Sequence, residues 1–100
     1  MKLREIAHGR AGDKGTIVNI SVIAFDVRDY PRIAEAVTAD RVRAHLAGLI
    51  HGAVVRYELP HLGALNFVLE RPPGSGVTRT LALDAHGKSL SSALLDLDIP

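Results

Sequence analysis

Residues 16–25, TIVNISVIAF, decide the fold class of this 100-residue chain. The stretch is rich in β-branched residues, which favour a strand. Side chains alternate between the two sides of a strand. One side is therefore wholly apolar and carries Val18, Ile20, Val22 and Ala24. The other side carries the polar Asn19 and Ser21. The pattern predicts a central strand, with one side on the core and the other near a site or a partner.

Helical and extended patterns alternate in the rest of the chain. Pro31 suits the first turn of a helix. Thr38 is a good N-cap for a second helical segment, whose apolar stripe is Val42, Leu46, Leu49 and Ile50, and which we expect Gly52 to end. Strands are expected at 2–8, 54–59, 64–70 and 79–84, a helix at 88–95 and a short strand at 97–99.

Helices separated by pairs of strands predict an α+β fold. We expect a single domain over residues 1–100, a ferredoxin-like sandwich whose mostly antiparallel sheet carries helices on one face, with an extra N-terminal strand. The predicted core contains Val18, Ile20, Val22, Leu46, Phe67 and Leu83.

Composition excludes several classes of function. A net charge of +1 and four aromatic residues give no case for a nucleic-acid partner. No apolar run reaches the length of a membrane span, and no signal peptide is apparent, so we expect a cytoplasmic protein without a membrane partner. The chain has no cysteine, and its five histidines lack the spacing of paired ligands, so we expect no metal and no cofactor.

The densest cluster of polar chemistry is HGRAGDKG at residues 8–15, and the glycines and charges of residues 9–15 predict a loop there. Arg10 can hold a carboxylate or phosphate in a fork, and Lys14 adds a compact charge. Backbone N–H groups around Gly12 and Gly15 can form an anion-binding nest, with Asn19 nearby.

Acid–base chemistry has two candidates in the same segment. His8 is one, because imidazole is a common general acid or base, and Asp13 is the other, because it can orient a neighbouring side chain or act as a base. The alternative is that Asp13-Lys14-Gly15 is an ordinary hairpin turn.

Two further residues are candidates for ligand binding. Arg79, after a glycine-rich stretch, can join an anion pocket or face solvent. Asn66 lies on a predicted strand beside that of Tyr57, where cross-strand packing is the default interpretation.

Four motifs together resemble the AtuA-like ferredoxin-fold domain over nearly the whole chain. They are residues 8–15 with Asn19-Ile20 after them, RYELP at 56–60, LNF at 65–67, and the stretch from Thr78-Arg79 to Gly87-Lys88. That family usually has Ser where this chain has Ala11, so a hydroxyl there is not essential. By motif match, the resemblance implies site roles for His8, Arg10, Asp13, Lys14 and Asn19, and further for Asn66 and Arg79.

The resemblance also implies a setting. In that family the domain is either the C-terminal part of a larger acyclic-terpene-utilisation protein or a separate small protein paired with it. The larger family is associated with breakdown of acyclic terpenes and branched acids through coenzyme A thioesters.

Three functional interpretations follow. We favour an accessory subunit or domain partner of a larger AtuA-type protein, which contributes an anion-binding loop for an acyl-CoA-like or other carboxylate ligand. The second is a self-sufficient homo-oligomeric enzyme with hydratase- or lyase-like chemistry, in which His8 or Asp13 is the acid or base. The third is a pure assembly module.

Overall fold

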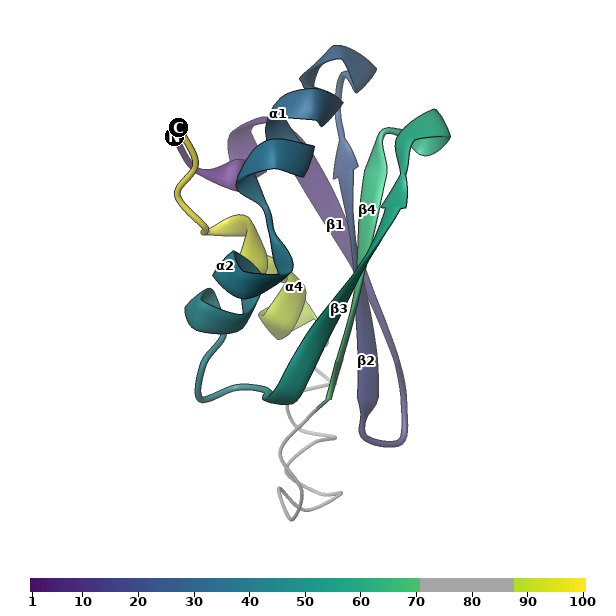
Figure 1. Cartoon of the computed structure of the whole chain (residues 1–100), viewed down its shortest axis with the longest axis vertical. Coiled ribbons are helices and arrows are strands. Elements are labelled where there is room, and N and C mark those ends of the chain that lie inside the picture. The colour runs from purple at the N-terminus through teal and green to yellow at the C-terminus, as the bar shows by residue number, and fades with distance from the viewer. Residues whose placement is uncertain (71–87) are drawn as a thin grey trace.

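A four-stranded antiparallel sheet with helices on one side forms the domain (Figure 1). The computed structural model describes residues 1–70 and 88–100. The strands are β1 (Ala7–Lys14), β2 (Ile17–Ala24), β3 (His51–Leu59) and β4 (Ala64–Glu70), in the spatial order β1-β2-β4-β3. The helices are α1 (Tyr30–Ala36), α2 (Ala39–His45) and α4 (Lys88–Leu95), and three short 3-10 helices are η1 (Leu3–Glu5), η2 (Val27–Asp29) and η3 (Pro60–Leu62).

The connection from β2 through α1 and α2 to β3 defines the topology. β4 pairs antiparallel with both β2 and β3 and lies between them, so β2 and β3 run in parallel as a split β-α-β unit. The predicted α+β class is confirmed, as is the antiparallel sheet with helices on one face. Among the described strands, β1 lies at one edge of the sheet, and an N-terminal strand in addition to it is not confirmed. The strand expected at 79–84 lies outside the described residues.

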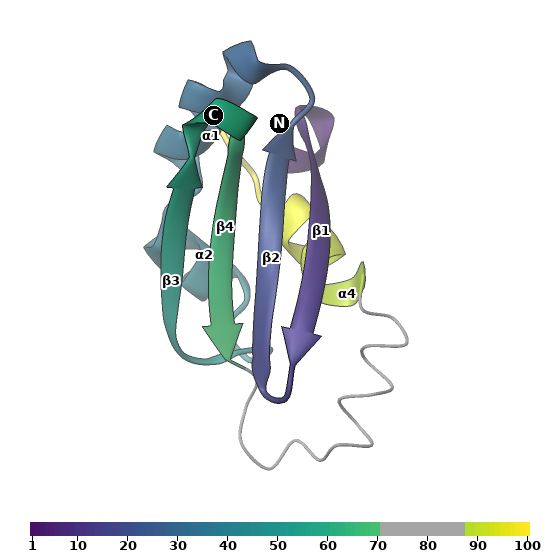
Figure 2. The ribbon, with the colours of Figure 1, turned by 90° about the vertical axis from the view of Figure 1, so that its right-hand side faces the viewer.

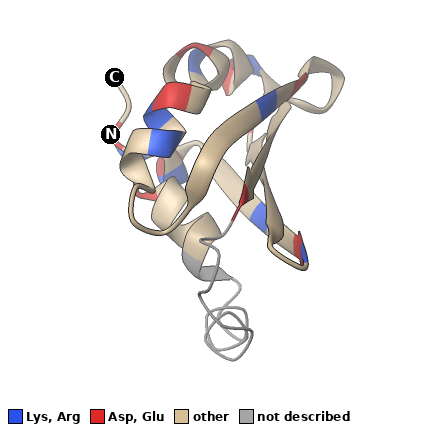
Figure 3. Ribbon diagram, turned by 60° about the horizontal axis from the view of Figure 1, so that its bottom comes forward, with Lys and Arg blue, Asp and Glu red and all other residues tan. Residues whose placement is uncertain are grey.

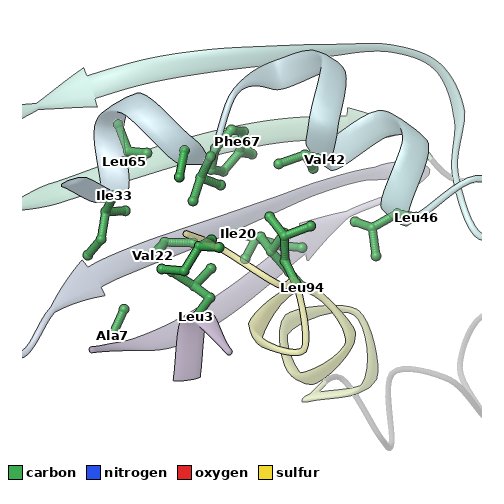
Figure 4. Close-up of a cluster of buried hydrophobic side chains, with 14 of the residues drawn as sticks. Leu3, Ala7, Ile20, Val22, Ile33, Val42, Leu46, Leu65, Phe67 and Leu94 are labelled. Atoms are coloured by element: carbon green, nitrogen blue, oxygen red, sulfur yellow. The ribbon is translucent and has the colours of Figure 1, made fainter. Parts of the chain in front are cut away.

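The core fills the space between the sheet and the helices (Figure 4). Val18, Ile20 and Val22 of β2 are buried, as their alternation predicted, and each such burial stabilises the fold by about 1.5–3 kcal/mol. Leu46 and Phe67 are also buried as predicted. Leu83 lies outside the described residues.

The predicted loop over residues 9–15 is wrong. These residues belong almost wholly to β1, which pairs with β2 from Ala7↔Ala24 to Lys14↔Ile17. The connection shrinks to Gly15 and Thr16. Gly15 has φ +63°, which suits the first position of a two-residue type II′ hairpin turn. The alternative interpretation, an ordinary hairpin turn at Asp13-Lys14-Gly15, agrees with the structure in having a hairpin, but the turn lies at Gly15 and Thr16, with Asp13 and Lys14 still paired in β1.

The second helix is shorter than predicted. Thr38 caps α2 as expected, accepting a hydrogen bond from the Arg41 N–H at 3.2 Å. The helix ends at His45, and Gly48, with φ +91°, follows it. Gly52 lies in β3, with φ +74°, where the register shifts between His51 and Val55. The predicted helical stripe was wrong at Leu49, because the helical spacing of apolar residues continues in the sequence beyond His45, where α2 ends.

The two ends of the described chain lie side by side (Figure 1). The Leu3 N–H donates to the Leu97 carbonyl at 2.9 Å, and the Ile99 N–H donates to the Met1 carbonyl at 2.8 Å. The extended segments expected at 2–8 and 97–99 thus meet in a single bridge, Lys2 to Asp98. Of the N-terminal segment, Leu3–Glu5 form η1, and Ala7 and His8 begin β1.

Candidate functional site

The side of the sheet turned away from the helices is the open face (Figure 2). The register assigns β1 residues to the two sides, because Gly9 pairs with the buried Val22 and Asp13 with the buried Val18. Asp13 and Gly9 are therefore on the helix side. The open face receives the alternate residues of β1, which are His8, Arg10, Gly12 and Lys14.

Arg10, Gly12, Lys14 and Asn19 form what we call the Gly12 cluster. Gly12 pairs with Asn19 across the hairpin, and a Cβ built on Gly12 would lie 3.6 Å from both Nδ2 and Oδ1 of Asn19. The Asn19 amide thus lies against the strand where Gly12 has no side chain. Arg10 and Lys14 flank Gly12 on the same strand, with Cα atoms about 14 Å apart at a rise of about 3.4 Å per residue. Their long side chains can converge above Gly12.

The Arg10 guanidinium differs from most arginines of the domain. Arg4 and Arg28 pair with carboxylates. Arg32, Arg41 and Arg56 donate to backbone carbonyls. By contrast, within residues 1–70 and 88–100 the side chains of Arg10, Lys14 and Asn19 make no hydrogen bond or ion pair. As far as the described residues go, these polar groups can bind a ligand or a partner.

A row of polar side chains crosses all four strands beside this cluster. The register places Arg10 opposite Ser21, Ser21 opposite Asn66, and Asn66 opposite Tyr57. Asn66 Nδ2 donates to Ser21 Oγ at 2.9 Å, in a partly buried setting. We call Arg10, Ser21, Asn66 and Tyr57 the polar row. Sequence reasoning assigned no ligand role to Ser21, although its position beside Asn19 on the polar side of β2 was the available signal.

Apolar side chains surround the polar groups of the open face. Ile17, Val55 and Leu59 are partly exposed there. Phe25, Val27 and Leu62 are 64%, 61% and 70% exposed and gather where β2 leaves the sheet and η3 joins β3 to β4. A Cβ on Gly63 would lie 3.4 Å from Val27 Cγ2, which ties these two segments together. We call Phe25, Val27 and Leu62 the apolar end patch.

The two acid–base candidates do not lie together. His8 is on the open face, where its ring stacks on Phe25 with centroids 5.3 Å apart. Asp13 is on the helix side, five residues further along β1, or about 17 Å at the rise of a strand. Within one chain, the two side chains cannot act on the same small substrate.

The expected anion nest does not form at residues 8–15. A nest needs successive N–H groups that converge, whereas successive N–H groups of a strand point in opposite directions. Gly15 instead forms the turn, and Asn66 lies two strands away from Arg10. Arg79 lies outside the described residues.

The charges of the strands favour an anion on the open face. Of the acidic residues in the four strands, Asp13 and Glu58 share register positions with the helix side and only Glu70 shares the open face. Most charged residues otherwise lie on the helices and at the β1–β2 hairpin tip (Figure 3). In the described part of the chain, no group of three or more histidines and carboxylates is placed to hold a metal ion. No helix there has the length and apolar character to cross a bilayer.

The fold and its open face together define a ferredoxin-like α+β domain with a polar sheet surface. A family model, the AtuA ferredoxin-like domain, matches residues 1–100, and the chain belongs to this family. Neither the curated proteins nor the solved structures gave a match.

Proposed function

We propose that this domain is the accessory partner of a larger AtuA-type protein, either as a separate subunit or as a fused domain, and that its open face completes a binding site for an anionic ligand. The ligand class proposed is a carboxylate, or an acyl-CoA-like thioester whose negative charges lie on the coenzyme A phosphates, from the catabolism of acyclic terpenes or branched acids. The observation that carries the proposal is the Gly12 cluster, in which two cations without a partner in residues 1–70 and 88–100 flank Asn19.

The shape of the open face supports a site shared with a partner. Ligand sites are concave and bury most of their ligand, whereas the Gly12 cluster lies on the surface of a sheet. A second protein surface over the open face would enclose the ligand and exclude water, which strengthens the attraction between the cations and an anion.

The apolar end patch supports the docking part of the proposal. Three large apolar side chains, each more than 60% exposed, lie at one end of the sheet. Aromatic and large apolar anchors at the centre of an interface supply most of its binding energy. A homo-oligomeric enzyme would use the same surfaces, and because His8 and Asp13 lie on opposite sides of β1, only His8 could act at a site on the open face.

The test is co-expression of the chain with a larger AtuA-type protein of the same genome. Complex formation is measured by co-purification and calorimetry, and binding of an acyl-CoA by calorimetry with each protein alone and with the complex. We expect the acyl-CoA to bind the complex much more tightly than either protein. The double variant Arg10→Ala/Lys14→Ala should weaken binding at least tenfold and leave the complex intact.

Arg43→Ala is the matched control, because this exposed arginine of α2 lies on the helix side and makes no ion pair in the described part of the chain. The proposal is wrong if no complex forms, or if the double variant binds the ligand as tightly as Arg43→Ala does. Turnover of a thioester by the isolated chain, abolished by His8→Ala, would instead establish the enzyme interpretation.

A further inference from the structure

We infer that Ser21 is a ligand-binding residue that, together with Arg10, holds the carboxylate of a monoanionic ligand, and that Asn66 positions the Ser21 hydroxyl. This inference rests on the proposed anion-binding role of the open face and specifies which groups bind and which anion they take.

The hydrogen bond between Asn66 and Ser21 is the first step. Asn66 Nδ2 donates to Ser21 Oγ at 2.9 Å, so one acceptor position of the hydroxyl is occupied. A serine hydroxyl has a single donor hydrogen and rotates to suit its acceptors. Because the Asn66 amide approaches the hydroxyl from the β4 side, the Ser21 O–H can donate to another acceptor. A hydroxyl that already accepts one hydrogen bond is also a stronger donor in a second hydrogen bond.

The position of Arg10 supplies the second step. Arg10 is the direct cross-strand neighbour of Ser21, and side chains in such pairs start about 5 Å apart at their Cβ atoms. The guanidinium fork can therefore bind two carboxylate oxygens, while the Ser21 O–H donates to one of them. Asn66 lies on the opposite side of Ser21 from Arg10, so it acts through the hydroxyl.

The charge of this region favours a carboxylate over a phosphate. The polar row contains one full charge, on Arg10, and three neutral side chains. Lys14 is two residues beyond Gly12, and its own row contains Glu70, which pairs with Ile17. That carboxylate opposes a second negative charge on a ligand, so a planar monoanion fits the row better than a dianion.

The sheet offers an apolar surface for the hydrocarbon part of the ligand. Val68 and Val55 follow Asn19 across the sheet in the neighbouring row, and Tyr57, which is 54% exposed, ends the polar row. A carboxylate held at Arg10 and Ser21 would place its apolar part over β4 and β3.

The experiment is an NMR titration of the isotope-labelled full chain with hexanoate, with inorganic phosphate, and with the neutral hexanamide. It is done on the chain alone and repeated on its complex with the larger AtuA-type protein where one forms. We expect hexanoate to shift the Arg10 Nε–H signal and the backbone amides of Ser21 and Asn66. Phosphate and hexanamide should bind at least several-fold more weakly.

Three variants separate ligand binding from fold effects. Ser21→Ala should weaken hexanoate binding about tenfold or more, the scale of one hydrogen bond to a charged group. Ser21→Thr keeps a hydroxyl on a residue that suits strands and should restore binding. Asn66→Ala alone should weaken hexanoate binding. Added to Ser21→Ala, it should weaken binding no further, because Asn66 acts only by positioning the Ser21 hydroxyl. Ser92→Ala, an exposed serine of α4, is the control.

The inference is overturned if hexanoate shifts none of these signals in chain or complex, if Ser21→Ala and Ser21→Thr bind equally, or if phosphate binds as tightly as hexanoate. The proposed function fails separately, when no complex with the larger protein forms. An acyl-CoA that binds the complex unaffected by Ser21→Ala would leave that function standing and end the role of Ser21.

Discussion

Three glycines in β1 and the turn that follows it have three different structural roles within seven positions. Gly9 lets α4 approach the sheet, since a Cβ there would lie 2.5 Å from the Oγ of the buried Ser91. Gly12 leaves room beside Asn19 on the open face, and Gly15 takes the positive φ of the turn. Of these three glycines, only Gly15 has a positive φ.

The contrast between Gly9 and Gly12 gives a prediction on stability. Gly9→Ala should lower the free energy of unfolding by about 1–3 kcal/mol, the usual cost of overpacking, because the methyl group would displace Ser91 and α4. Gly12→Ala, whose nearest contacts are ordinary at 3.6 Å, should be neutral or stabilise by about 0.5 kcal/mol, because alanine loses less backbone entropy than glycine in a strand. Denaturant unfolding of both variants measures this. Equal stabilities would show that α4 does not depend on the close approach.

The residue scale also shows what alternation alone can establish. Asn19 and Ser21 were assigned to one side of β2 and Val18, Ile20 and Val22 to the other, and the register and burial confirm this. The loop over residues 9–15 was wrong because glycine and charge are typical of loops. Their place in a strand depends on α4 packing against Gly9, a contact with residues some eighty positions away that no local pattern contains. The ligand roles of the candidate residues stay predictions.

At the scale of elements, the start of η2 is stabilised by a local ion pair. Asp26 Oδ1 accepts from the Arg28 N–H at 2.9 Å, and the Arg28 side chain binds both carboxylate oxygens. The side-chain hydrogen bond from Arg28, and then its backbone hydrogen bond, lower the pKa of Asp26 from its ordinary value of 3.8. The same contact raises the pKa of Arg28.

This pair predicts a pH dependence with a definite sign. Because the pKa of Asp26 is lower in the folded state, its contribution to stability is complete above the ordinary pKa and is lost as the pH falls through the folded value. In Arg28→Ala the pKa of Asp26 should return toward 3.8, measured by carbon NMR titration of the carboxyl group. Arg43→Ala should leave the titration unchanged. An unchanged Asp26 titration in Arg28→Ala would show that the pair does not persist in solution.

Helix and strand boundaries were predictable where a chemical signal marks them. Ala64–Glu70 and Lys88–Leu95 were predicted to the residue, and Thr38 was correctly placed as a cap. The end of α2 was not, since Leu49 and Ile50 continue the apolar spacing although the backbone turns at Gly48. The fold class was therefore predictable, while the length of this helix and the beginning of β3 depended on tertiary pairing with β4.

For the whole molecule, the helices cover one side of the sheet and leave the other to partners (Figures 1 and 2). The bonded ends of the described chain lie on the helix side, away from the polar row. The open face and the apolar end patch therefore form one continuous side of the domain on which docking and ligand binding would occur together.

The apolar end patch predicts a docking defect separable from ligand binding. Phe25→Ser and Leu62→Ser should each weaken the complex with the larger AtuA-type protein by about 2 kcal/mol or more, the range of interface anchors, measured by calorimetry. Leu49→Ser is the matched control, because Leu49 is also exposed, at 46%, but follows α2 on the other side of the sheet. If all three variants dock equally, the patch is not the anchor of the complex.

The two-residue connection at Gly15 and Thr16 has a consequence for electrostatics. Strand pairing has a period of two, so a shift of β1 by a single residue would exchange its sides completely. Arg10 and Lys14 would then turn toward the helices, and Asp13 would emerge in their place. The length of this hairpin turn, rather than the composition of β1, thus sets whether the electrostatic potential at the β1 edge of the open face is positive or negative.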